Sequence, residues 1–410
     1  MTLSLVAALT LAPFPQIGLS DECALMPEGR IGELVAMAWQ ESAKPETDKQ
    51  KKERERHEND LKGDVELGKK YAAEVEKELK ISKNQAYIDR VNRVAGELIP
   101  IAQTKQVKVT WGDPRLNKFD YTFKVVENDQ VNAFSLPGGF IFVYEGLVEY
   151  AESDDELAGV LAHEIAHASF RHVATLQRES SKLQLIQLPA ILIAILSGGQ
   201  AGGDVLMLSQ LLGQATGSGW GQKAELAADF GSFQYLQSSK YNSVGMLTFI
   251  ERLARDQKTI ESIDWGIYRT HPPSRERAEN LTKYFTEAKV PIRRSLVSTS
   301  ARTSVRTKDN GTAELIFDKR PIYAFGGELA ANRAESAAGR LNEFFDSVPD
   351  LYEVTVTPDG AVRGRKEILF RITEDDAKAA NKTVDTLSAE ALKNMKRSLF
   401  LLAYRIWDAR

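Results

Sequence analysis

Apolar positions follow a helical period over one part of the chain and occur in short strand-like runs over the next. Between residues 64 and 102, apolar side chains recur every three or four positions, which predicts two helices. Runs rich in β-branched and aromatic residues then predict strands at 107–111 and 122–126. A third strand is expected at 132–144, with an interruption at Pro137-Gly138-Gly139. This order predicts helices beside a small sheet.

The pattern changes at about residue 293, where strand, turn, strand and helix signals occur loosely twice. The predicted elements are strands at 312–317, 352–357 and 367–372 and helices at 328–345 and 388–408. This region contains no His and no Cys, and it has no group of side chains typical of a catalytic site. We therefore expect residues 291–410 to form a separate α+β domain that binds a protein partner.

Two apolar stretches bear on membrane contact. Residues 2–14 have the length of a signal-peptide core, but the first basic residue is Arg30, so the charged n-region is missing. We expect residues 1–41 to be either a secretion signal or an apolar segment that packs on the protein. Residues 183–212 are divided by Gln, Pro and Gly, so they do not predict a transmembrane helix. They predict either a pair of core helices or a hairpin that touches a membrane or a substrate.

Composition and charge narrow the function classes. The chain of 410 residues has 53 Lys and Arg against 57 Asp and Glu. It lacks the excess of basic residues that is typical of nucleic-acid-binding proteins, so we do not expect nucleic acid as a partner. Its single cysteine, Cys23, excludes an intramolecular disulfide and a cysteine-based zinc finger. Residues 42–63 are mostly charged with mixed sign, which is typical of a solvated linker or an exposed helix. Any metal must therefore be bound by His and carboxylate groups.

The run His163-Glu164-Ile165-Ala166-His167 carries the clearest chemical signal. It lies on a predicted helix that Ser153 or Asp154 would cap. Residues four apart share a helix face, so both imidazoles can reach one cation, with Glu164 beside them. Zinc accepts imidazole nitrogen and carboxylate oxygen, and a catalytic zinc site has three protein ligands and an open position.

The third ligand is expected in the Ala-rich helical segment at 223–229. Glu225 and Asp229 share one face of that helix, so Glu225 can bind the metal while Asp229 accepts the second ring N–H of a ligand histidine. His172 lies five residues after His167 and is expected to support a ligand from behind or to lie on the surface, not to bind the metal. A solvated acidic pair is the alternative for Glu225 and Asp229.

Three motifs in this order resemble the M48 metallopeptidases. They are H-E-I-A-H at 163–167, E-L-A-A-D at 225–229 and T-H-P-P-S-R-E-R at 270–277. The likeness covers about residues 64–285 and includes V-N-A-F-S-L-P-G-G-F-I-F-V at 131–143. It implies a mostly helical, zincin-type catalytic domain with a small sheet at 64–290, and hence an α+β fold class for the chain.

The resemblance also implies roles for single residues. The implied ligands of one Zn2+ per chain are His163, His167 and Glu225, with Glu164 as the catalytic glutamate and Asp229 behind a ligand histidine. His271 and Arg277 match the late motif, whose side chains are thought to lie near the metal and to bind substrate or the tetrahedral intermediate. We expect His271 to act in catalysis by stabilising the oxyanion. Without the resemblance, a histidine before two prolines would be typical of a turn.

These parts predict a zinc endopeptidase that cleaves unfolded or misassembled polypeptides. Zinc lowers the pKa of a bound water to about 7, and Glu164 takes the proton, so that the water attacks the scissile carbonyl. An extended peptide is expected to add to an edge strand at 140–144, with Asn132, Phe140 and Phe142 as candidate substrate-binding residues.

The alternative function is a chaperone or assembly factor with a latent protease site that binds unfolded envelope proteins. A histidine plug or the apolar stretch at 183–212 would then keep the site closed. Both hypotheses place the protein in the periplasm or cell envelope of a bacterium, with membrane association through 183–212.

Overall fold

The structure is a computed structural model that describes residues 46–181, 220–259, 271 and 274–402. The chain divides into two compact units, Met1–Asn59 and Asp60–Arg410. The expectations for residues 1–41 and 183–212 lie outside the described residues. None of the described helices combines the length and the apolar content that a bilayer span requires.

Two long helices, α2 (Asp48–Glu78) and α3 (Gln85–Thr104), account for the two helices predicted before the sheet. Asn84 caps α3 because its side chain accepts hydrogen bonds from Ala86 N and Tyr87 N. Helix α2 begins inside the charged stretch, so this stretch is helical from Asp48 onward. Of the two alternatives for 42–63, a linker or an exposed helix, the structure has the helix from Asp48 onward, and α2 continues into the region after residue 63.

A three-stranded sheet contains β1 (Thr122–Val126), β2 (Ala133–Leu136) and β3 (Phe140–Tyr144). The short 3-10 turn η2 (Pro137–Gly139) reverses the chain, so that β2 and β3 pair antiparallel. The strand order is β1-β3-β2, and β1 pairs with β3 in parallel. The prediction of an edge strand at 140–144 is therefore wrong, because β3 is hydrogen-bonded on both sides.

The predicted strand at 107–111 is also wrong. The backbone of Lys108 bonds a side chain instead of a neighbouring strand, since its N–H donates to Gln234 Oε1 at 2.8 Å and its carbonyl accepts from Gln234 Nε2 at 2.9 Å. Apolar side chains in this segment still pack on the core. Alternating hydrophobicity reported the burial correctly, but it could not show that a helix side chain satisfies the backbone.

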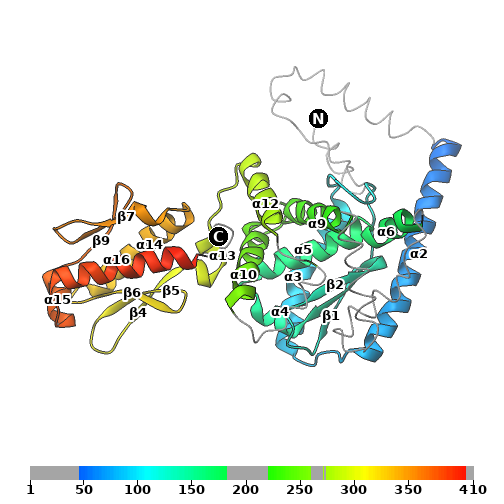
Figure 1. Cartoon of the computed structure of the whole chain (residues 1–410). Helices are drawn as coiled ribbons and strands as arrows, with labels where there is room; N and C mark the ends of the chain where they lie inside the picture. The colour runs from blue at the N-terminus through cyan, green and yellow to red at the C-terminus, as the bar shows by residue number, and fades with distance from the viewer. Residues whose placement is uncertain (1–45, 182–219, 260–270, 272–273, 403–410) are drawn as a thin grey trace, which may run out of the picture. The chain divides into compact units, whose positions relative to one another are not determined.

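The helices after the sheet surround a central helix, α5 (Asp154–Ser169), which Ser153 caps as predicted. Helix α5 packs on α3 and also on α9 (Trp220–Leu236) and α10 (Val244–Thr259), as Figure 1 shows. The remaining helices of this region are α4 (Glu145–Tyr150), α6 (His172–Ser181), α12 (Arg275–Glu287) and α13 (Arg294–Val297). The predicted combination of a mostly helical region and a small sheet is confirmed.

The C-terminal region has a hydrophobic core of its own, as predicted for a second α+β region. One antiparallel sheet contains β4 (Thr303–Thr307), β5 (Ala313–Phe317) and β6 (Arg320–Phe325), and a second contains β7 (Val354–Val356), β8 (Ala361–Gly364) and β9 (Glu367–Arg371). The helices are α14 (Ala330–Asp346), α15 (Glu374–Ala380) and α16 (Val384–Leu401), and short 3-10 turns lie at η3 (Thr299–Ala301) and η4 (Leu351–Glu353). The sequence patterns missed β4, β6 and β8.

Helix α2 packs closely on the Pro137–Gly139 turn, and two of its glycines differ in what surrounds them. A Cβ on Gly68 would lie 1.9 Å from the Pro137 carbonyl oxygen, whereas nothing lies within 4 Å of a Cβ on Gly63. We expect Gly63→Ala to stabilise the protein by roughly 0.5–1 kcal/mol through helix propensity. We expect Gly68→Ala to destabilise it by roughly 1–3 kcal/mol, because backbone must move. Urea unfolding of both variants measures the difference, and equal effects would contradict this packing.

Candidate functional site

Helices α5 and α9 position the predicted metal-binding side chains. Their close approach depends on small residues, since a Cβ on Gly231 of α9 would lie 2.9 Å from the Ala166 Cβ of α5. His163 and His167 lie one turn apart on α5, and Glu225 of α9 faces them. His163 and Glu225 are buried, so their polar atoms need partners inside the protein.

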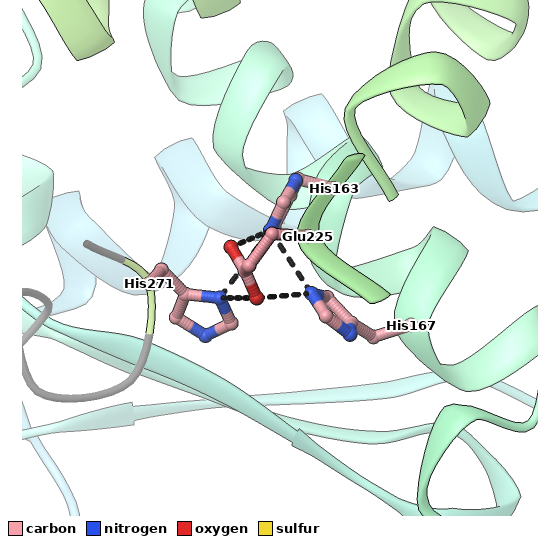
Figure 2. A group of neighbouring side chains, drawn as sticks. All are labelled: His163, His167, Glu225 and His271. Atoms are coloured by element: carbon pink, nitrogen blue, oxygen red, sulfur yellow. Dashed lines mark hydrogen bonds and ion pairs between the residues drawn. The ribbon is translucent and has the colours of Figure 1, made fainter. Parts of the chain in front are cut away.

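The donor atoms of these side chains lie at separations that suit a tetrahedral cation. His163 Nε2 is 3.0 Å from His167 Nε2 and 3.4 Å from Glu225 Oε2, and His167 Nε2 is 3.2 Å from Glu225 Oε1 (Figure 2). Ligands about 2.1 Å from a tetrahedral zinc ion would lie about 3.4 Å from one another. The residues present therefore fit zinc.

His271 joins the same group of potential ligands. Its Nδ1 lies 3.3 Å from His163 Nε2 and 2.9 Å from Glu225 Oε1. Ligand atoms of His163, His167, Glu225 and His271 all lie within 4.8 Å of one another. Figure 2 shows the His271 ring on the side of Glu225 opposite His167. His271 thus adds a fourth potential ligand atom to the group. The role predicted from the sequence, at the oxyanion, does not require His271 to lie among the ligands.

A carboxylate and an arginine lie behind the ligands. Asp229 Oδ1 is 3.0 Å from His163 Nδ1, the contact expected from the spacing of Glu225 and Asp229. Arg277 of α12 donates to both Asp229 oxygens at 2.7 Å, and its Nη1 lies 3.1 Å from Glu225 Oε2. Arg277 also donates to the His271 carbonyl oxygen at 3.2 Å. Arg277 thus joins three residues of the site, and its predicted contact with substrate stays a prediction.

Pairing of the buried charges sets the pKa values in the site. Burial raises the pKa of Glu225, but His271, Arg277 and the α5 histidines outweigh it and hold this pKa well below its usual range. Burial lowers the pKa of His163, yet hydrogen bonds to Asp229 and Glu225 raise it to about 9. The carboxylates thus favour a positive charge at His163, where a bound cation would lie. Burial lowers the pKa of His167.

Glu164 lies beside the cluster in a different environment. Its side chain is 1% exposed, and neither carboxylate oxygen accepts a hydrogen bond from the described residues. The structure gives one ion-pair-range contact for it, with the His271 ring, whose Nε2 lies 3.4 Å from Glu164 Oε1. A buried carboxylate with free lone pairs can accept a proton from a water or a substrate.

The other candidate substrate-binding residues lie on β3 or just before β2. Phe142 is 1% exposed and its ring stacks on Phe134 at 5.2 Å between centroids, so it is a core residue. Phe140 packs near Gly68 of α2. Asn132 is buried, and its amide oxygen has no hydrogen-bond partner in the described part of the chain. The expectation of an edge strand at 140–144 did not show which of its side chains belong to the core.

His172 is the residue whose placement the sequence left open. Its Nδ1 lies 2.9 Å from His167 Nδ1, and its ring is 2% exposed. Its other nitrogen, Nε2, lies 3.0 Å from the Trp111 carbonyl oxygen. No sequence pattern indicated the part played by the Trp111 carbonyl, because any residue supplies a backbone oxygen.

Comparison with known proteins agrees with the site. Residues 103–285 match the model of Peptidase family M48. The chain is 35% identical over 164 residues to the beta-barrel assembly-enhancing protease of Escherichia coli K12, covering 38% of this chain and 32% of that protein. It is 30% identical over 171 residues to the metalloprotease LoiP of the same organism, covering 40% and 63%.

A mitochondrial relative shares the same region. The metalloendopeptidase OMA1 of Saccharomyces cerevisiae is 28% identical over 160 residues, which cover 38% of this chain and 44% of that protein. The chain spans about a third of the length of the beta-barrel assembly-enhancing proteases that it matches.

The Arg277 contacts generate a stability prediction. Arg277→Ala leaves Asp229 buried beside His163 without its bidentate partner, so we expect the free energy of unfolding to fall by about 3–5 kcal/mol. Arg275→Ala on the same helix removes an exposed pair with Glu279 and should change it by less than about 0.5 kcal/mol. Urea unfolding of the metal-free proteins measures both. A loss below about 1 kcal/mol in Arg277→Ala would contradict a buried, paired role.

Proposed function

We propose that this chain, whose residues 103–285 form a domain of Peptidase family M48, is a zinc-dependent endopeptidase. One observation carries the proposal: His163, His167 and Glu225 present donor atoms to one point, and the buried Glu164 carboxylate lies beside it. A site used only to hold a fold would not need an acid with free oxygens. The three ligands and this acid together suit hydrolysis.

His163, His167 and Glu225 would hold one zinc ion, which when bound polarises water and the scissile carbonyl. Glu164 would accept the proton of the attacking water and pass it to the leaving amine. Its oxygens accept no hydrogen bond from the described residues, so both can face a water or a substrate. Asp229 would keep His163 oriented, since its carboxylate can only accept from the ring Nδ1–H.

The proposed substrate is unfolded or misassembled polypeptide that binds in an extended form. Strand β2 is the outer strand beside α5, because it pairs with β3 on one side only among the described strands. A pocket near this strand is lined by Ser135, Leu136, His167 and His172. An extended peptide could add to β2 beside these residues. We therefore propose that the substrate adds to β2 and not to β3.

Cellular setting and partners are part of the same proposal. One relative bears the name beta-barrel assembly-enhancing protease, and we propose by analogy that this chain acts on envelope proteins in the periplasm. Membrane contact through 183–212 remains part of that proposal. The C-terminal region would bind a protein partner, since it has its own core and exposes large apolar side chains at Val348, Leu351 and Tyr352.

The position of His271 favours a second candidate, a latent protease that acts mainly as a binding or assembly factor. A catalytic zinc site needs an open position for water or substrate. His271 Nδ1 lies among the ligand atoms and would occupy that position. The site would then open only when the His271 side chain leaves the group of ligand atoms.

The role of Glu164 is tested by cleavage of casein with wild type and Glu164→Gln, with zinc measured in both. We expect Glu164→Gln to keep its zinc and to lose cleavage by at least about 100-fold, because the amide cannot take the proton. Zinc content is measured on protein never exposed to chelator.

Glu225→Ala is the matched control for the metal, because it removes a ligand and leaves Glu164 in place. We expect it to lose both zinc and cleavage. If Glu164→Gln cleaves casein at the wild-type rate, Glu164 is not the general base. Stoichiometric zinc in Glu225→Ala would reject the ligand set.

The His271→Ala variant distinguishes two roles of His271, stabilising the oxyanion and keeping the site closed. The ring lies within the ligand cluster, so we expect its removal to open one position and to increase casein cleavage several-fold while zinc stays bound. A fall of about 100- to 1000-fold in the rate would instead support the oxyanion role. Rates at saturating casein, with zinc content determined on the same samples, distinguish the two.

A further inference from the structure

The two α5 histidines are supported by different partners. His163 faces the Asp229 carboxylate, whereas His167 faces the imidazole of His172, with 2.9 Å between the two Nδ1 atoms. His172 is buried, and the centroids of the His172 and His167 rings are 4.8 Å apart, with the rings edge to face. A hydrogen bond at this separation requires that one Nδ1 carry a proton and the other present a lone pair.

The hydrogen bond of the second nitrogen of His172 shows which of the two Nδ1 atoms carries the proton. His172 Nε2 lies 3.0 Å from the Trp111 carbonyl oxygen, and a carbonyl only accepts hydrogen bonds. Nε2 of His172 therefore carries the proton, and a neutral ring then has its lone pair on Nδ1. His167 must donate from Nδ1, which leaves its Nε2 lone pair directed at His163 and Glu225.

The turn between α5 and α6 is built to hold His172 in this position. Arg171 has a φ of 54°, in the left-handed region, and this bend brings His172 back over His167. Arg171 is buried, and its guanidinium pairs with Asp64 and Asp113. Two buried carboxylates therefore fix the residue that makes the bend, which offsets its backbone strain.

The loop that supplies the Trp111 carbonyl is fixed to the same turn. Asp113 N donates to the Phe170 carbonyl at 2.7 Å, and Asn117 Nδ2 donates to the Ser169 carbonyl at 2.7 Å. Gly112 has a φ of 118°, and a Cβ there would lie 2.5 Å from the Phe170 carbonyl oxygen. The close approach thus requires glycine, and it sets the Trp111 carbonyl against the His172 ring.

From these contacts we propose that His172 is a positioning residue that fixes the tautomer and ring orientation of His167 for metal binding. This inference rests on the proposed metal site. A neutral acceptor behind His167 adds no further negative charge to a site that already holds Glu164, Glu225 and Asp229. The Trp111 carbonyl, His172 and His167 form a relay of hydrogen bonds that ends at the metal-facing nitrogen.

The test compares zinc affinity in wild type, His172→Leu and His172→Asn, using the full chain and competition with a chelator of known affinity. His172→Leu removes the acceptor, so we expect affinity to fall by about 10- to 100-fold. His172→Asn can present its amide oxygen to His167 Nδ1, so we expect a smaller loss. His57→Leu replaces a histidine far along the sequence from the site and should keep wild-type affinity.

Two further readouts separate positioning from a role in folding. The visible spectrum of bound Co2+ should change in His172→Leu and return toward wild type in His172→Asn. Urea midpoints of the metal-free variants report packing alone. Unchanged zinc affinity in His172→Leu overturns the proposal. An equal loss of zinc affinity in His172→Leu and His172→Asn, matched by an equal fall in their urea midpoints, also overturns it. Absence of zinc binding in wild type would instead reject the metal site itself.

Tautomers in zinc-loaded wild type give a check that needs no variant. Histidine 1H–15N spectra should show a proton on Nδ1 of His167 and on Nε2 of His172, with Nδ1 of His172 unprotonated. A proton on Nδ1 of His172 would overturn the proposal even if the variants failed to fold.

Discussion

The pairing of two buried carboxylates, Glu225 and Asp229, with histidine and arginine side chains is the interaction on which the site depends. A carboxylate inside an Ala-rich helix interface is costly unless donors surround it. His163, His271 and Arg277 supply these donors. The same pairing that makes the buried acids tolerable also directs imidazole nitrogens toward one point. Stability and metal-binding geometry therefore have a common cause.

The two histidines of α5 that we propose as metal ligands are oriented by different kinds of partner. His163 has a charged acceptor, Asp229, which Arg277 neutralises from behind. His167 has a neutral acceptor, His172, whose own proton goes to a backbone carbonyl. Using a carboxylate for both would place another negative charge near Glu164. The mixed arrangement keeps the charge of the site close to balance while both rings stay fixed.

The surrounding fold serves mainly to hold α5 and its following turn. Helices α3, α9 and α10 pack on α5 directly, and β2, one of the two outer strands of the sheet, also contacts it. The buried pairs of Arg171 with Asp64 and Asp113 connect α2 and the loop after α3 to the end of α5. The C-terminal region has a separate hydrophobic core and contains no histidine, whereas the candidate metal site is built from α5, α9 and His271.

The sequence by itself determined the features that depend on local spacing. Four-residue separation places His163 over His167 and Glu225 over Asp229, and capping by Ser153 sets the start of α5, because helix geometry is short-range. Only the tertiary structure decided that β3 is central, that 107–111 is no strand and that His172 meets His167. Those outcomes depend on which distant groups satisfy a backbone or a ring nitrogen. Periodicity reports burial but not the identity of the partner.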